Sequence, residues 1–512
     1  MGMRRLARIA RPGWVAFFAT AGVGIVAPAW AQQAPVAQAP PATEKPTSTA
    51  PVHIPVELNQ IEPNGLTAEQ VGQRAAATSY TAKAADAALR GAAERVDAAW
   101  VAFLPRLSVL GRYTRLSDFT APSLFSVPSG INSVVTTSPP GGPAAPGTLI
   151  SAAQPDVSFP LVLNNWLMQA TLSIPISDYF LRINQNYSAA THAQDAARFD
   201  AATARAKSGS DGKVTFYSWL RARGAVIVAA QALNDQRNHL NDAKNQFAVG
   251  NASRADVLRA ETAVAAAELQ VVRSQNFANL TEKQVRVAIH AKEGDRVAPG
   301  ENIDAPPPAF TGNLPQMTQE ALSARFEVKS IDANANAAKQ QAEAARAGKY
   351  PVLSAFGDGI YANPNPRKFP AAQEWFPTWD VGAQVTWSPN DFASAGHVAA
   401  DIESRAQQFE AQRGTVRDGI EIEVTQSFQS VQESDVALES TKRQLASATE
   451  AYRVARELFN NGRATSTTLT DSETELTRAR LDALNATADA RIARVRLDHA
   501  LGRDTRMVNP AP

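Results

Sequence analysis

The 512-residue sequence lacks cysteine altogether and has a formal net charge of only +1. Without cysteine the chain can form no disulfide framework, and it cannot be anchored through a lipid-modified cysteine. The near-zero charge leaves no electrostatic footprint for nucleic acid. We therefore expect no nucleic-acid partner.

Catalytic and metal-binding patterns are also missing. The sequence has no glycine-rich phosphate loop, and its histidines are scattered with no pair at the spacing of helical metal ligands. They are His53, His192, His239, His290, His397 and His499. We therefore expect neither an enzyme nor a cofactor; an exported enzyme would need a cluster of catalytic residues that the sequence does not offer.

The N-terminus has the pattern of a secretory signal. Four arginines precede an apolar run from Trp14 to Ala27, and a small-x-small site follows at 29–31. The alternative, a single N-terminal membrane anchor, is less favoured because the run is short for a bilayer span. Beyond residue 31 no run approaches the roughly 18 apolar residues of a spanning helix. The exported chain is then a soluble periplasmic protein, or one whose membrane part is a β-barrel.

The sequence is a tandem duplication. Pro105-Arg-Leu-Ser-Val-Leu-Gly recurs at Pro351, and the Phe-x-x-Gly-x-Ala-Ser/Thr phrase around Gly250 recurs around Gly462. The stretch that leads to each of these glycines has kept its length in both copies. Duplicated long elements of constant length predict helical hairpins and an extended assembly.

Two segments alternate with a period of two, which predicts half-buried strands. In residues 164–176 every second side chain is apolar from Trp166 onward, and residues 379–387 alternate in the same way from Trp379 to Trp387. Less regular partner strands are expected near 106–116 and 351–362. A Pro/Gly/Ser/Thr-rich loop is expected at 120–163, and a shorter one at 363–377.

Apolar residues spaced by seven predict coiled-coil packing in four helices. The series in the second copy is Val424, Val431, Leu438, Leu445, Tyr452 and Phe459, then Leu469, Leu476, Ala483, Ala490 and Leu497. In the first copy it is Val226, Leu233, Leu240 and Phe247, then Val257, Val264, Val271, Ala278 and Val285. Ser208–Gly212 would be unfavourable inside a helix, so the sequence leaves open whether the long helix is kinked or broken there.

These patterns divide the chain into ten parts. They are a signal peptide (1–31), a Pro/Ala-rich leader (32–65), a helix (66–104), strands with a loop (105–178), a long helical hairpin (179–292), an inter-repeat linker (293–318), a second helix (319–349), strands with a loop (350–390), a second hairpin (391–503) and a tail (504–512).

Four amphipathic strands cannot close a barrel, and open sheet edges are not tolerated in hydrocarbon. Closure would need several copies, and three would supply 12 strands, within the usual range of outer-membrane barrels. The fold class predicted is therefore an α+β membrane protein: a trimeric 12-stranded transmembrane β-barrel, four strands per protomer, continued by a long α-helical coiled-coil barrel.

The ordered set of features resembles the outer membrane efflux proteins of the TolC family. The resemblance covers roughly residues 66–503 and includes Ile174-Pro-Ile-Ser-Asp178 at a strand-to-helix junction. There are departures, since Trp387-Ser-Pro-Asn-Asp391 displaces the usual proline. The resemblance implies a homotrimeric channel in the outer membrane that extends into the periplasm. Its implied partners are a periplasmic adaptor, an inner-membrane pump and outer-membrane lipid.

The resemblance also implies site residues. Adaptor contact is expected at the helical tips, at Gly250, Ser253, Gly462 and Thr465. A pore-narrowing gate is expected at Asp471, Asp256 and Thr468, where three symmetry-related Asp471 carboxylates would form a negative ring. The alternative for either aspartate is a solvated residue near a helix start. Phe459 and Ala464 replace the tyrosine and arginine that latch the gate in relatives, so that latch is absent or rebuilt.

Aromatic residues mark candidate membrane interfaces. Trp166, Trp375, Trp379 and Trp387 are assigned to this role, because amphipathic rings sit at the edges of a bilayer. The alternative for the Trp375–Trp379 cluster is ordinary loop packing. A competing interpretation of the whole chain is a soluble periplasmic coiled-coil scaffold or an adaptor protein, which would have two-sided polar strands or a small sandwich.

Overall fold

The computed structural model describes residue 62 and residues 65–118, 162–303, 305, 307–369 and 372–504. The predicted signal peptide, nearly all of the leader, most of the 120–163 loop and the tail beyond 504 lie outside the described residues. The chain divides into two units, Met1–His53 and Ile54–Pro512, and all that follows concerns the second.

No helix in the described ranges combines the length and the apolar character needed to cross a membrane.

The order of elements repeats itself once along the chain. The first copy comprises α1 (Ala68–Thr78), α2 (Tyr80–Val101), β1 (Arg106–Arg115), β2 (Asn164–Ile174), α3 (Ile176–Asp178), the π-helical turn η2 (Tyr179–Ile183), α4 (Asn184–Ala248) and α5 (Arg254–Ala288). The second comprises α6 (Leu314–Ala324), α7 (Phe326–Arg346), the 3-10 turn η3 (Ala347–Lys349), β3 (Val352–Asn363), β4 (Phe376–Thr386), α8 (Pro389–Asn460) and α9 (Ser466–Ala500).

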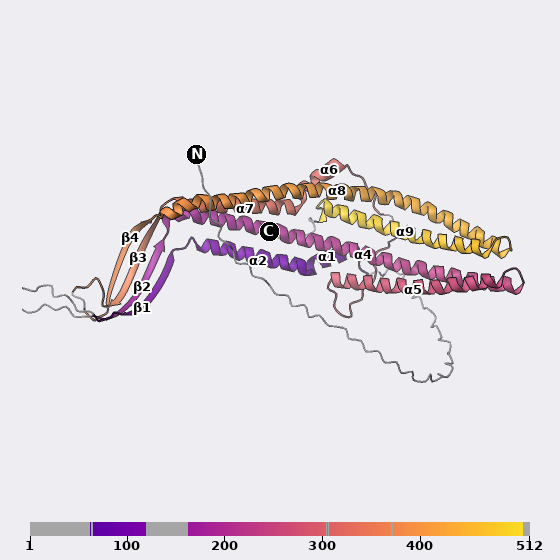
Figure 1. Cartoon of the computed structure of the whole chain (residues 1–512), viewed down its shortest axis with the longest axis horizontal. Helices are drawn as coiled ribbons and strands as arrows, with labels where there is room; N and C mark the ends of the chain where they lie inside the picture. Colours follow the sequence, from indigo (N-terminus) through magenta and orange to yellow (C-terminus); the bar gives the residue numbers. More distant parts are fainter. Residues whose placement is uncertain are drawn as a thin grey trace, which may run out of the picture. The chain divides into compact units, whose positions relative to one another are not determined.

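The four strands form one antiparallel sheet in the order β1-β2-β3-β4. Val109 lies opposite Ala170, Met168 opposite Tyr361, and Gly359 opposite Trp379. Figure 1 shows the strands beyond one end of the helices, with the α4–α5 and α8–α9 turns at the other end. β1 and β4 are the outer strands, so each has one edge without a partner within the sheet.

The sheet has one apolar and one mostly polar face. The strand register places on one face the exposed apolar side chains Leu107, Val109, Tyr113, Trp166, Met168, Leu172, Leu353, Tyr361, Trp379, Val381 and Val385. The opposite face carries the polar residues Ser108, Arg112, Gln169, Thr171, Ser354, Asp358, Asp380, Gln384 and Thr386. The alternation predicted for β2 and β4 is therefore present, whereas β1 and β3 are less regular: Leu110, Phe356 and Ile360 lie on the mostly polar face.

Two very long helices carry the rest of the fold. α4 has 65 residues and α8 has 72, so α4 extends over about 100 Å at a rise of 1.5 Å per residue. α4 pairs with α5 and α8 with α9, while α7 packs against both long helices and α9 also contacts α4. The predicted seam is largely buried, at Val226, Leu233, Val257, Val271, Ala278, Val285, Val424, Val431, Leu438, Phe459, Leu469, Leu476, Ala490 and Leu497.

The long helix is not broken at Ser208–Gly212, because α4 is continuous through these residues. The reason is tertiary: the glycines let α1 approach α4 closely. A Cβ at Gly212 would lie 2.7 Å from the Ala75 Cβ, and one at Gly209 would lie 3.3 Å from the Gly72 carbonyl oxygen. Close packing against α1 offsets the low helix propensity of the segment.

Where single helices were expected at 66–104 and 319–349, the structure has two helices each. α1 ends at Ser79, which also caps α2 by accepting a hydrogen bond from the Thr81 amide. α6 ends at Arg325, whose extended backbone (φ −63°, ψ 129°) starts α7. Ser79 precedes Pro105 by the same number of positions as Arg325 precedes Pro351, and each proline leads into a strand. The break therefore belongs to the repeat.

Candidate functional site

The first helical tip turns at Gly250, whose positive φ of 81° favours glycine. Ser253 then caps α5 in a reciprocal box with Asp256: the Ser253 hydroxyl accepts from the Asp256 amide at 3.2 Å, and the Asp256 carboxylate accepts from the Ser253 amide at 3.0 Å. Both predicted tip residues of the first repeat therefore define the turn.

The second tip is built in the same way. Gly462 has a φ of 67°, and the Thr465 hydroxyl accepts from the Thr468 amide at 3.2 Å to cap α9. The Gln246 side chain donates to the Asn460 carbonyl at 3.2 Å, so the two tips contact each other.

The structure gives the three predicted gate residues different settings. Asp256 and Thr468 occupy the same repeat position and are engaged in helix caps. Hydrogen bonds from Ser253 lower the pKa of the Asp256 carboxyl, and the Arg259 charge acts in the same direction. Asp471 lies exposed further along α9, at the position that Arg259 holds in the first repeat. The capping alternative thus describes the immediate environment of Asp256.

The predicted interface aromatics are spread along the sheet. Trp166 packs on Tyr113 with ring centroids 4.4 Å apart, and Trp375 stacks on Tyr361 at 4.9 Å, both at the end of the sheet that is remote from the helices. Trp379 lies within β4 and is 77% exposed. The stacking of Trp375 on Tyr361 is also what ordinary loop packing would give. The structure is therefore compatible with both interpretations of the Trp375–Trp379 cluster, a membrane-interface role and local packing.

A second aromatic group lies at the strand–helix junctions, and the sequence interpretation recognised only Trp387 among its members. The other exposed rings are Trp100, Phe180, Tyr350 and Phe392. Trp387 and Phe392 are in contact, with ring centroids 6.1 Å apart. Their signal in the sequence was proximity to the predicted element boundaries at 105, 178, 351 and 391.

The polar face of the sheet carries its own hydrogen-bonded groups. Gln169 donates to the Asp358 carboxylate at 3.0 Å, and Thr171 donates to the same carboxylate. Arg367 donates to the Asp380 carboxylate at 2.6 Å. Two partly exposed carboxylates on this face thus have partners, while the opposite face offers mainly apolar side chains.

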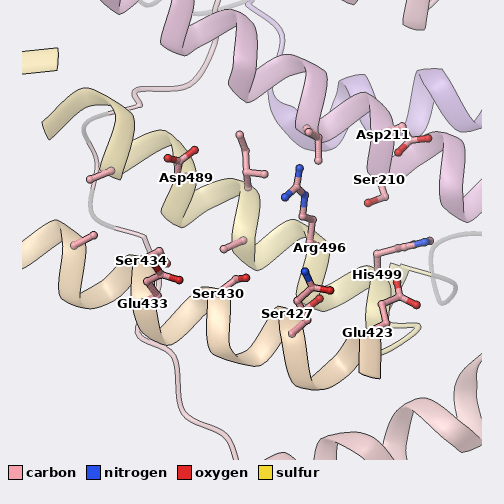
Figure 2. A pocket seen from close by; sticks show the side chains of 16 residues that line it. Ser210, Asp211, Glu423, Ser427, Ser430, Glu433, Ser434, Asp489, Arg496 and His499 are labelled. Carbon is pink, nitrogen blue, oxygen red and sulfur yellow. The ribbon is translucent and has the colours of Figure 1, made fainter. Parts of the chain in front are cut away.

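A groove of about 610 Å³ lies between α4, α8 and α9 (Figure 2). Most of the residues that line it have polar side chains: Ser210 and Asp211 come from α4, Glu423, Ser427, Ser430, Glu433 and Ser434 from α8, and Asp489, Arg496 and His499 from α9. Burial lowers the pKa of His499, but the Asp504 carboxylate 2.6 Å away outweighs it and the net pKa is raised. In the described part of the chain, no three His, Asp or Glu side chains gather as metal ligands would.

Two helices expose apolar stripes that nothing in the unit covers. On α5 the exposed residues Leu258, Leu269, Val272, Leu280 and Val287 follow helical spacing and share one face. On α8 the exposed residues Ile422, Val436, Val454 and Leu458 also share one face, where polar residues such as Gln429 and Ser440 lie between them. Within the described chain, α5 packs mainly on α4, and α8 packs mainly on α7 and α9. The stripes therefore lie on helix faces turned away from the main packing.

The sequence matches the outer membrane efflux protein family over residues 71–289 and 317–503, which is more than half of the chain. The chain belongs to the outer membrane efflux protein family. Members of this family are channel proteins and not enzymes. The predicted fold class, a trimeric 12-stranded barrel continued by a helical barrel, is confirmed as the architecture of this family, to which the chain contributes four strands and two paired hairpins.

Solved structures show the same fold at low sequence identity. The chain is similar to CusC, a protein whose structures were described in relation to folding and transmembrane channel formation. The TM-score is 0.68 at 14% sequence identity, and the match covers 88% of this chain and 96% of CusC. It is similar to the outer membrane protein VceC from Vibrio cholerae, with a TM-score of 0.65 and 16% sequence identity. That match covers 85% of this chain and 96% of VceC. It is also similar to the CmeC outer membrane channel of Campylobacter jejuni, with a TM-score of 0.63 and 15% sequence identity. That match covers 86% of this chain and 88% of CmeC. No curated protein sequence matches the chain.

Proposed function

We propose that this efflux-family protein is the outer-membrane duct of a tripartite efflux or type I secretion system. It passively conducts substrates from an inner-membrane pump across the periplasm and the outer membrane, and it acts as a homotrimer. The observation that carries the proposal is the sheet, with one continuous apolar face and two unpaired edges.

The apolar face fits contact with lipid, and the polar face fits a water-filled interior. Because unpaired backbone groups are unfavourable in hydrocarbon, β4 of one protomer would pair with β1 of the next until three copies close the barrel. Trp166 and Trp375 at one end of the sheet and Trp387 at the other would then lie near the two membrane surfaces.

The helical part supports the same assembly. Each protomer presents an apolar stripe on α5 and another on α8, which allows a head-to-tail contact that closes into a ring. The tips at Gly250, Ser253, Gly462 and Thr465 would meet the periplasmic adaptor. Asp471, with Asp256 and Thr468 in the adjoining caps, would line the narrow periplasmic end.

A soluble periplasmic scaffold or adaptor is the alternative. It would need the apolar side chains of the sheet to be buried in a sandwich, yet Val109, Trp379 and Val381 are each more than 70% exposed in the single chain. That exposure favours a lipid-facing sheet over a sandwich.

Cell fractionation tests the proposal directly. We expect the mature protein in the detergent-extracted outer membrane, as a particle of three copies, with ion conduction in planar lipid bilayers. Recovery as a stable monomer in the osmotic-shock supernatant would reject the duct. Photo-crosslinking from Val249 and Arg463 at the tips should capture an adaptor, whereas the same probe at Arg417, near the middle of α8, should not.

A further inference from the structure

Two ionisable side chains are buried inside the helical part, close to the tips. His239 on α4 is 2% exposed and Glu473 on α9 is 3% exposed. His239 Nδ1 lies 3.1 Å from Glu473 Oε2, and its Nε2 lies 3.2 Å from the hydroxyl of Ser466, the first residue of α9. Both ring nitrogens are therefore engaged, and both partners belong to the other repeat.

The contact depends on α4 and α9 remaining packed against each other. The Phe459 ring stands edge-on to the imidazole with centroids 5.4 Å apart and closes one side of the site. If α4 and α9 separated, His239 and Glu473 would lose their partners together. Removing one member of a buried pair is strongly unfavourable, because it leaves the other group uncompensated.

The site sits between the hairpins at equal distance from both turns. His239 precedes Gly250 by as many positions as Glu473 follows Gly462. This separation is about three helical turns, or about 16 Å along the helix axis. α4 and α9 share two further ion pairs, Asp235–Arg480 at 3.1 Å and Arg221–Asp489 at 3.0 Å, but their side chains are more exposed and lie farther from the tips.

The duplication offers no second copy of this contact. The repeat equivalents of His239 and Ser466 are Ala451 and Arg254, and only Glu473 has a like residue, Glu261. Glu261 instead faces Lys244 at 3.7 Å, with both side chains about half exposed. The buried polar contact of His239 is therefore present at only one of the two positions that the duplication makes equivalent.

We propose that His239, Glu473 and Ser466 form a clasp that holds the two hairpins of one protomer together and sets the resting closure of the periplasmic end. The proposal rests on the proposed duct function. Neutral His239 can donate from Nδ1 to the Glu473 carboxylate and accept from the Ser466 hydroxyl at Nε2, which satisfies both ring nitrogens.

The test uses the full-length protein with His239→Ala, Glu473→Ala and the double variant, alongside Glu473→Met, which is similar in size but lacks a strong acceptor. Lys244→Ala and Glu261→Ala are the matched controls, because they remove an exposed pair at the corresponding place. Two readouts are taken: amide hydrogen exchange of residues 236–249 and 462–476 in the purified assembly, and single-channel current in planar bilayers.

We expect each single clasp variant to raise exchange in both segments and the open fraction of the channel by at least about tenfold, since a buried partner is left unpaired. The double variant should add little to either single change. The controls should match the unmodified protein. If a variant to alanine fails to assemble, Glu473→Met still decides, because methionine is similar in size and cannot accept a strong hydrogen bond from His239.

Exchange and current that stay at the unmodified level in the clasp variants, or that change equally in the controls, would overturn the clasp. Failure of the unmodified protein to conduct in any bilayer would instead reject the duct, while the exchange data would still report whether His239 and Glu473 hold α4 to α9. The two failures are therefore distinguishable.

Discussion

Gly212 on α4 faces Ala75 on α1 so closely that a Cβ at Gly212 would fall 2.7 Å from the Ala75 methyl. This contact explains why a segment with poor helix propensity stays within a 65-residue helix. Gly414, in the long helix α8, has no atom within 4 Å of the place where its Cβ would be. The two positions therefore form a natural pair for substitution.

We expect Gly212→Ala to destabilise the protein, because overpacking costs about 1–3 kcal/mol and exceeds the gain in helix propensity. Gly414→Ala should stabilise it by about 0.5–1 kcal/mol. Thermal unfolding of the detergent-solubilised protein measures both. A rise in melting temperature for Gly212→Ala would show that α1 is not tightly docked.

The capping box of the first tip predicts a pH dependence. Hydrogen bonds from Ser253 lower the pKa of Asp256, so its contribution to stability is present above the ordinary carboxylate pKa of about 3.9 and is lost as the pH falls through the lower folded value. Hydrogen exchange at the start of α5 should therefore accelerate on acidification. Ser253→Ala should cost about 1 kcal/mol at neutral pH and flatten this dependence.

An added positive charge should destabilise the protein on the apolar face of β4 but not on its polar face. Val381→Arg places a cation on the apolar face and should cost about 2–4 kcal/mol if that face meets the bilayer core. Gln384→Arg, further along the same strand on the polar face, should have little effect. Outer-membrane yield and urea unfolding in lipid vesicles compare the two. Equal losses would argue against a lipid-facing sheet.

The exposed stripes on α5 and α8 predict where protomers meet. Leu280→Asp on α5 and Val436→Asp on α8 should each weaken the trimer, because they place a carboxylate against apolar side chains of a neighbour. Lys442→Asp, an exposed change six residues after Val436 and therefore about 120° around α8 from it, is the control. Particle mass after mild detergent extraction reports the result, and intact trimers in both aspartate variants would refute this interface.

Asp471 offers a test of ion selection. Three exposed carboxylates in a ring would favour cations, so Asp471→Ala should reduce cation preference and change single-channel conductance. Glu475→Ala, one turn further along α9, should alter either property less. An unchanged reversal potential in a salt gradient for Asp471→Ala would place the constriction elsewhere.

Local patterns were enough to predict the strands, the hairpins and the seam. Alternation around Trp379 and heptads from Val424 to Leu497 depend on neighbours in sequence, and these elements are where they were expected. The breaks at Ser79 and Arg325 were missed because both flanks are rich in helix formers. Only the shared distance to Pro105 and Pro351 could have revealed them.

Features that depend on distant partners could not be predicted in this way. His239 looked like one scattered histidine, since Ser466 and Glu473 lie 227 and 234 residues away. The heptad pattern likewise assigned equal roles to Phe247 and Phe459, yet Phe247 is 43% exposed and Phe459 is 5% exposed. Which of two equivalent side chains is covered depends on packing between the repeats.

The free borders of β1 and β4 also bear on how a cell must handle this protein. A newly exported subunit has two edge strands that can pair with any extended chain, next to a large exposed apolar surface. Aggregation is avoided only when a chaperone binds the subunit or when it has assembled with other subunits. Synthesis that exceeds the rate of insertion into the membrane should therefore burden periplasmic quality control. Insertion and oligomerisation would then be a single coupled event.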